Sequence, residues 1–71
     1  MGSVYKIVEL VGTSETSWED AAATAVATAG SSLRDLRVAE VTDLDLHIAD
    51  DGSIAAYRTK VKLSFKHEGS I

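Results

Sequence analysis

Cysteine and proline are absent from this chain of 71 residues, and tryptophan, tyrosine and phenylalanine together number only four. Without cysteine the chain has neither disulfides nor a thiolate metal site, and two histidines are too few to form a zinc site alone. No proline-rich linker, internal repeat or low-complexity segment divides the sequence. We therefore expect one domain over residues 1–71.

Large apolar side chains are also scarce, because much of the 45% hydrophobic content is alanine. A chain of this length buries only roughly 60% of the surface that its unfolded form exposes, so its own core is small. Two sources of added stability remain, namely association with copies of itself and a cation held by oxygen ligands. We expect the first of these.

The sequence has no long apolar run and no excess of positive charge. No stretch approaches the roughly 20 apolar residues of a membrane-spanning helix, and the first residues lack the pattern of a signal peptide. We expect a cytoplasmic protein with no membrane partner. Eleven acidic residues against seven basic ones give a net charge of −4, which disfavours nucleic acid as a partner.

The first half of the sequence predicts a strand followed by a helix. Residues 4–11 alternate and are rich in β-branched side chains, and Gly12 is expected to end this strand. Residues 18–30 are strong helix formers, with Thr16 as the expected N-cap and Glu19 completing a capping box. The helix face expected to pack on a sheet comprises Trp18, Ala21, Ala22, Ala25, Val26, Ala29 and Leu33.

Residues 36–65 predict a long β-hairpin. Asp51-Gly52 favours a two-residue type I′ turn, which fixes the pairing of the two strands. In this register acids oppose bases twice and apolar residues oppose one another repeatedly. The expected pairs are His47–Ala56, Leu46–Tyr57, Asp45–Arg58, Leu44–Thr59, Asp43–Lys60, Thr42–Val61, Val41–Lys62, Glu40–Leu63 and Val38–Phe65.

The expected fold class is α+β, a β-α-β-β protomer with a three-stranded antiparallel sheet and one helix packed on it. Such a helix covers one face of the sheet only. Long strands that extend beyond it, with their edges open, usually pack against other copies. The length of the hairpin therefore predicts an assembly surface.

Two acidic residues of the hairpin are candidate metal ligands. Asp43 and Asp45 point to the same side of one strand, about 7 Å apart. They are suited to a hard cation, together with Glu15 or with a carboxylate of a neighbouring copy. The alternative interpretation is structural, with the two acids pairing with Lys60 and Arg58 across the hairpin.

No combination of residues indicates catalysis. His47 and His67 fall on strand positions without a nucleophile motif nearby, and Trp18 is typical of core or interface packing. We therefore expect a protein that is not an enzyme.

Several segments, in order and in spacing, resemble the dodecin family over nearly the whole chain. They are VYKIVELVGTS, the capped alanine-rich helix, LRDLRVAEV and AYRTKVKLSF. The resemblance implies a β-α-β-β protomer that assembles with itself into a hollow homododecamer. It also implies a shell that binds or stores a small ligand.

Two positions depart from the flavin-binding dodecins. In those proteins a tryptophan that stacks on the flavin ring precedes the Glu-Val motif, and Val38 stands at that position here. Their third strand carries an aromatic-Gln-Thr or aromatic-Gln-Val pattern, whereas this chain reads Tyr57-Arg58-Thr59. Valine lacks a π face and arginine cannot accept a hydrogen bond, so flavin binding (riboflavin or FMN) is expected to be weakened.

These departures, with TSWEDAAA and RVAEV, make the chain most similar to the flavin-lacking calcium dodecin branch. In dodecins, divalent ions lie near acidic residues at two positions. One position corresponds to Asp43, and the other corresponds to Thr16, next to Glu15. The resemblance thus implies a shell that binds calcium or a similar cation through Asp43 and Glu15. The alternative is a flavin-storing dodecin with a remodelled pocket lined by Val38, Tyr57 and Arg58.

Overall fold

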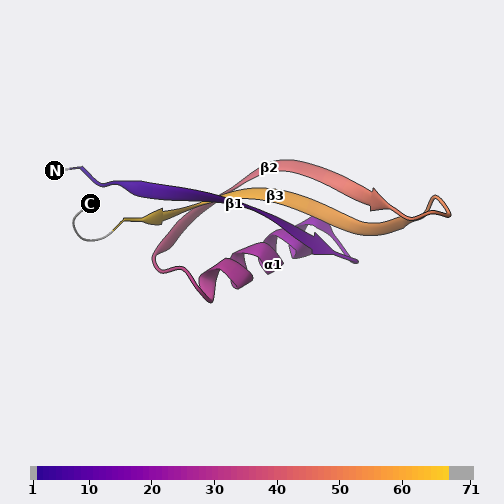
Figure 1. Cartoon of the computed structure of the whole chain (residues 1–71), viewed down its shortest axis with the longest axis horizontal. Coiled ribbons are helices and arrows are strands. Elements are labelled where there is room, and N and C mark those ends of the chain that lie inside the picture. The colour runs from indigo at the N-terminus through magenta and orange to yellow at the C-terminus, as the bar shows by residue number, and fades with distance from the viewer. Residues whose placement is uncertain (1, 68–71) are drawn as a thin grey trace.

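The computed structural model describes residues 2–67, so residue 1 and residues 68–71 of the expected domain lie outside the described part. Within residues 2–67, three antiparallel strands form one sheet with a single helix against it, and the expected β-α-β-β fold is confirmed (Figure 1). Within the described residues, no helix is long and apolar enough to span a membrane. The elements are β1 (Tyr5–Ser14), α1 (Trp18–Gly30), β2 (Leu36–Ile48) and β3 (Ile54–Lys66), and the strand order in the sheet is β1-β3-β2.

The helix begins after a loop that is held together by hydroxyl groups. Ser17 is the N-cap, because its Oγ accepts a hydrogen bond from the Asp20 backbone N–H at 3.0 Å. Thr16 instead donates its backbone N–H to Ser14 Oγ at 3.0 Å, and Ser14 Oγ donates to the Asp20 carboxylate at 2.7 Å. The N-cap thus lies one position after the predicted Thr16, and the predicted capping box of Thr16 and Glu19 is wrong.

The core lies between the alanine face of α1 and the central strand. Ala25 and Ala29 are buried and pack against Val61 and Leu63 of β3. This packing confirms the predicted sheet-facing side of the helix. The small side chains at these positions let the helix approach the sheet closely. Partly buried side chains complete the cluster: Val8, Leu10, Ala22, Val26, Leu33 and Leu36.

The sequence predicts that Gly12 ends the first strand. This is wrong, because β1 continues to Ser14. A Cβ atom at Gly12 would overlap the Ala21 carbonyl oxygen and lie 3.1 Å from Ala25 Cβ. The glycine is therefore required for close approach of the helix backbone to the strand.

The hairpin turn has three residues rather than two. Gly52 donates its backbone N–H to Ala49 O at 2.9 Å, and Ala49 donates to Ser53 O at 2.8 Å. Gly52 has a φ of 87°, while Asp51 is not among the residues with positive φ, so the predicted type I′ turn is wrong. The geometry is that of a turn followed by a glycine in the left-handed region, a common three-residue hairpin.

The predicted register of the hairpin is correct over one part of the strands and wrong over another. A bulge near the turn restores the expected pairs from His47–Ala56 to Asp43–Lys60. A second irregularity between Val41 and Asp43 then shifts the pairs from Val41 to Val38 by one residue, and a third, between Val38 and Leu36, pairs Leu36 with Phe65. The corrected pairs are Val41–Val61, Glu40–Lys62, Ala39–Leu63 and Val38–Ser64.

This shift changes the partner of Glu40, which the predicted register paired with the apolar Leu63. Its partner is Lys62 rather than Leu63, on the side of the sheet that faces away from the helix. The bulge therefore places the carboxylate opposite an ammonium group instead of among apolar side chains.

The helix packs mainly over β1 and β3, and the far half of the hairpin extends beyond it (Figure 1). The molecule is elongated, with extents of 54 × 20 × 17 Å. Large apolar side chains along β2 and at the hairpin tip remain exposed: Val38, Val41, Leu44, Leu46, Ile48 and Ile54.

Candidate functional site

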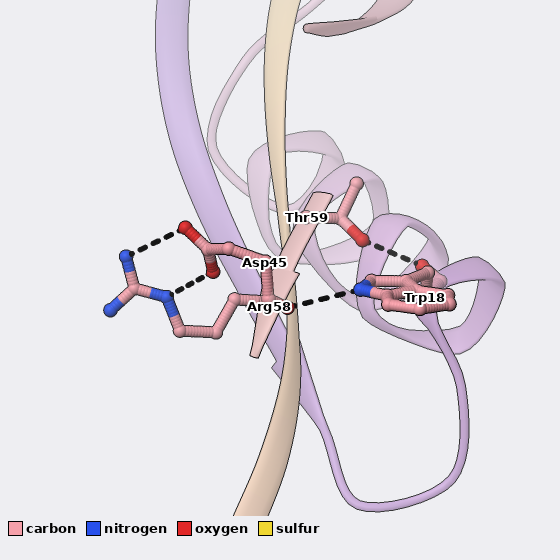
Figure 2. Close-up of polar contacts among 4 residues, drawn as sticks. All are labelled: Trp18, Asp45, Arg58 and Thr59. Atoms are coloured by element: carbon pink, nitrogen blue, oxygen red, sulfur yellow. Dashed lines mark hydrogen bonds and ion pairs between the residues drawn. The ribbon is translucent and has the colours of Figure 1, made fainter. Parts of the chain in front are cut away.

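The start of α1 contacts the middle of the hairpin through Trp18. Its indole Nε1–H donates to the Asp45 backbone oxygen at 3.0 Å, and its own carbonyl accepts the Thr59 hydroxyl at 2.9 Å (Figure 2). The ring stands edge-on to Tyr57, with centroids 5.2 Å apart and an interplanar angle of 81°. Edge-to-face geometry is favourable for aromatic pairs, so the helix start is fixed to both strands of the hairpin.

Arg58 is held by the side chain of the same Asp45. The distances are 2.7 Å from Nε to Oδ1 and 3.4 Å from one terminal nitrogen to Oδ2. This pair points away from Trp18, on the opposite side of the hairpin (Figure 2). Two-point contact of this kind fixes the plane of the guanidinium group, although both side chains remain about two-fifths exposed, at 41% and 43%.

The face of the sheet away from the helix carries a row of cations along β3. Arg58, Lys60 and Lys62 alternate with the buried residues of that strand, and acids of β1 and β2 flank them. Lys62 Nζ lies 3.8 Å from Glu9 Oε1, and Glu40 is its partner on the other side. The charges of this face thus largely offset one another.

Asp43, like Glu40, differs from Asp45 and Glu9 of the same face. It is exposed and opposite Lys60, yet within residues 2–67 its carboxylate is in none of the ion pairs. Its oxygens are therefore available to a hard cation, which prefers carboxylate ligands. The groove beside it is lined by Glu9, Leu10, Val11, Thr42, Asp43, Lys60, Val61 and Lys62.

Glu15 does not join Asp43 in the protomer. It follows Ser14, which pairs with Tyr57, three residues along β3 from the Lys60 partner of Asp43. This spacing separates the two acids by roughly 10 Å along the strands, and β3 lies between them. Across residues 2–67, no three acidic or histidine side chains gather in a group suited to a metal ion. Further ligands would have to come from neighbouring copies.

The residues expected to line a flavin pocket are also divided. Tyr57 contacts Trp18, whereas Arg58 points to the opposite side of the hairpin, and Val38 pairs with Ser64, six residues beyond Arg58 on β3. That spacing corresponds to roughly 20 Å. Val38 is 61% exposed, so a site that uses all three positions would need more than one copy of the chain.

The sequence interpretation treated Trp18 as a packing residue and missed its hydrogen bonds. The sequence feature that could have indicated one of these hydrogen bonds is Thr59, a polar residue between helix-facing apolar positions of β3. Its side chain is only 1% exposed, and a buried hydroxyl needs a hydrogen-bond partner. The partner, the Trp18 carbonyl, comes from 41 residues away in the sequence.

A model of the dodecin family matches residues 4–68. The chain belongs to the dodecin family. The calcium dodecin of Mycobacterium tuberculosis is 50% identical over 64 residues, which cover 90% of this chain and 89% of that protein. The dodecin of Thermus thermophilus is 41% identical over 68 residues, covering 96% of this chain and 97% of that protein.

Solved dodecin structures share the whole fold. The crystal structure of the calcium-chelating calcium dodecin of M. tuberculosis, which contains a calcium-binding site, matches with a TM-score of 0.83. Its sequence is 48% identical, and the match covers 97% of each chain. The resemblance inferred from the sequence motifs is therefore confirmed, including its closeness to calcium dodecin.

Proposed function

We propose that this dodecin is a non-enzymatic protomer of a hollow shell that binds and stores calcium or a similar divalent cation. The observation that carries the proposal is the 50% identity to calcium dodecin over 90% of the chain. The exposed Asp43 carboxylate, which has the oxygen chemistry that calcium prefers, supports it.

The shell is supported by the surface that the protomer leaves uncovered. The exposed apolar side chains of β2 and the hairpin tip form the kind of surface that marks a protein interface. Membership of the dodecin family supports twelve copies. Light scattering should therefore give a particle of about 90 kDa for twelve chains of 7.5 kDa, and a monomer would contradict the shell.

In the proposed cation site Asp43 supplies one ligand and neighbouring copies supply the others. Glu15 is the candidate second ligand, since its exposed position leaves it available to a symmetry-related Asp43. Burial of such carboxylates together without a cation would be unfavourable because like charges repel. The cation would thus contribute to holding the copies together.

Equilibrium dialysis of the assembled particle against radioactive calcium tests this site. Asp43→Asn should lower the number of bound ions, whereas Asp50→Asn removes the same charge at the exposed hairpin tip and should leave binding unchanged. Absence of binding by an intact particle at millimolar calcium, the weak end of the range for protein calcium sites, would overturn the proposal.

Flavin storage is the alternative function, favoured by the aromatic pair of Trp18 and Tyr57. Val38 argues against it because a valine cannot stack on a flavin ring. Riboflavin and FMN fluorescence distinguishes the two functions. An intact particle that leaves the flavins bright excludes the alternative, and strong quenching would support it.

A further inference from the structure

The hairpin tip contains an Asp-Gly dipeptide, Asp51-Gly52, and both residues are exposed. An aspartate before glycine is chemically vulnerable, because its side-chain carboxyl carbon can be attacked by the following backbone nitrogen. Glycine has no Cβ to hinder this attack. The cyclic imide that forms leads to isoaspartate.

In the structure, both reacting groups form hydrogen bonds that oppose this reaction. Asp51 Oδ1 accepts hydrogen bonds from the Ser53 backbone N–H at 3.0 Å and from the Ser53 hydroxyl at 2.6 Å. The Gly52 nitrogen, which would be the nucleophile, donates its hydrogen to Ala49 O at 2.9 Å. The carboxyl group is thus directed toward Ser53, and the nitrogen is engaged in the turn.

The hydrogen bonds from Ser53 also lower the pKa of the Asp51 carboxyl group from its ordinary value. An ionised carboxylate is a poorer electrophile than a protonated one, because water leaves more readily from the protonated group. The same contacts therefore oppose the reaction through both geometry and charge.

We infer that Asp51-Gly52 is a site of spontaneous isomerisation that Ser53 restrains. In the reaction the Gly52 nitrogen forms a bond to Asp51 Cγ, the Gly52 amide proton is lost, and the carboxyl oxygen leaves as water. A solvent water molecule then opens the imide at either carbonyl. Opening at the backbone carbonyl gives isoaspartate, with no net change in atoms or electrons.

Isomerisation here would alter the surface proposed for assembly. Isoaspartate inserts one methylene group into the backbone between residues 51 and 52. The three-residue turn from Ala49 to Ser53 cannot keep its two backbone hydrogen bonds after this lengthening. Ile48 and Ile54, the exposed apolar residues at the tip, would then change position.

Ageing of the assembled protein at neutral pH tests the inference, with the wild type, Ser53→Ala and Ser53→Thr compared. Isoaspartate is counted by enzymatic methylation and by loss of cleavage on the amino side of residue 51 with an Asp-specific protease. Ser53→Ala should isomerise about fivefold faster, the factor expected for loss of one hydrogen bond of ordinary net strength. Ser53→Thr retains the hydroxyl and should age like the wild type.

Equal rates in Ser53→Ala and the wild type would overturn the inference. Ser53 is exposed, so the fold should survive its replacement, and circular dichroism verifies this. A second comparison uses Asp51→Asn, which releases ammonia as the same imide forms, so that intact mass follows imide formation and hydrolysis. Adding Ser53→Ala to this variant should accelerate the mass change, and an unchanged rate would again overturn the inference.

Discussion

The Trp18 indole donates a hydrogen bond to the Asp45 backbone oxygen at 3.0 Å, while Arg58 binds the carboxylate of the same Asp45 on the other side of the hairpin (Figure 2). One residue of β2 thus joins the start of α1 to β3 through both of its polar groups. The contact spans 27 residues of sequence, so it forms only when the helix and hairpin are docked.

Replacement of Trp18 by Phe should lower the free energy of unfolding by about 1 kcal/mol, the usual net value of one hydrogen bond. The aromatic contact with Tyr57 is largely kept, while the Asp45 carbonyl loses its donor. Denaturation followed by circular dichroism measures the change. The protomer concentration must be held constant, because association contributes to apparent stability.

Tyr5→Phe is the matched control for this substitution. It also removes one polar hydrogen from an aromatic residue, but Tyr5 is 48% exposed on β1. The control should have the stability of the wild type. Equal destabilisation by both substitutions would show that the Trp18 hydrogen bond adds nothing to the free energy of unfolding.

Replacement of Gly12 by Ala should destabilise the protein by about 1–3 kcal/mol or more, the range for overpacking a tight contact. The added Cβ would overlap the Ala21 carbonyl oxygen, and backbone cannot move aside as a flexible side chain does. Gly2→Ala is the control, since no atom lies within 4 Å of its added Cβ. Thermal unfolding of both variants tests the prediction, and equal melting temperatures would contradict it.

The elements and the helix face could be predicted from the sequence because they depend on local patterns. Alternation, alanine content and the Asp45–Arg58 charge pair all follow from residue types at fixed spacing. The bulge next to Thr42 could not be predicted from the sequence, because a β-branched residue fits a regular strand equally well. The error at the Asp51-Gly52 turn was hidden by a compensating bulge, so the central pairs were correct despite a wrong turn.

Less of the candidate site than of the fold could be predicted from the sequence. The resemblance to dodecins predicts roles for Val38 and Arg58 in flavin binding, but their separation along β3 depends on the register of the hairpin, which bulges change. Asp43 pairs with Lys60 as predicted, but the place of Glu15 depends on the pairing of β1 with β3, which leaves the two acids roughly 10 Å apart along the strands. Residue types indicate what chemistry is available, and only the fold shows which residues meet within a protomer.

The titration of Asp51 should depend on Ser53. Its hydrogen bonds hold the pKa of the Asp51 carboxyl group below the ordinary value of 3.8. A lowered folded-state pKa stabilises the protein above the unfolded value, and this contribution disappears as the pH falls through the folded value. Ser53→Ala should therefore move the carbon chemical-shift titration of the Asp51 carboxyl to higher pH. An unchanged midpoint would contradict the assignment, and Ser53→Thr should keep the low midpoint.

Restoring the two altered positions should restore flavin binding in the assembled protein. Val38→Trp supplies a ring whose stacking contributes about 0.5–1.5 kcal/mol per contact, and Arg58→Gln supplies an amide that both donates and accepts hydrogen bonds. The double variant should quench riboflavin fluorescence strongly, whereas Arg58→Gln alone should not, because Val38 still offers no π face. Val41→Trp is the control, since Val41 is 51% exposed on the other face of the same strand. Equal quenching by this control would mean that any exposed tryptophan binds flavin, and the role assigned to position 38 would be wrong.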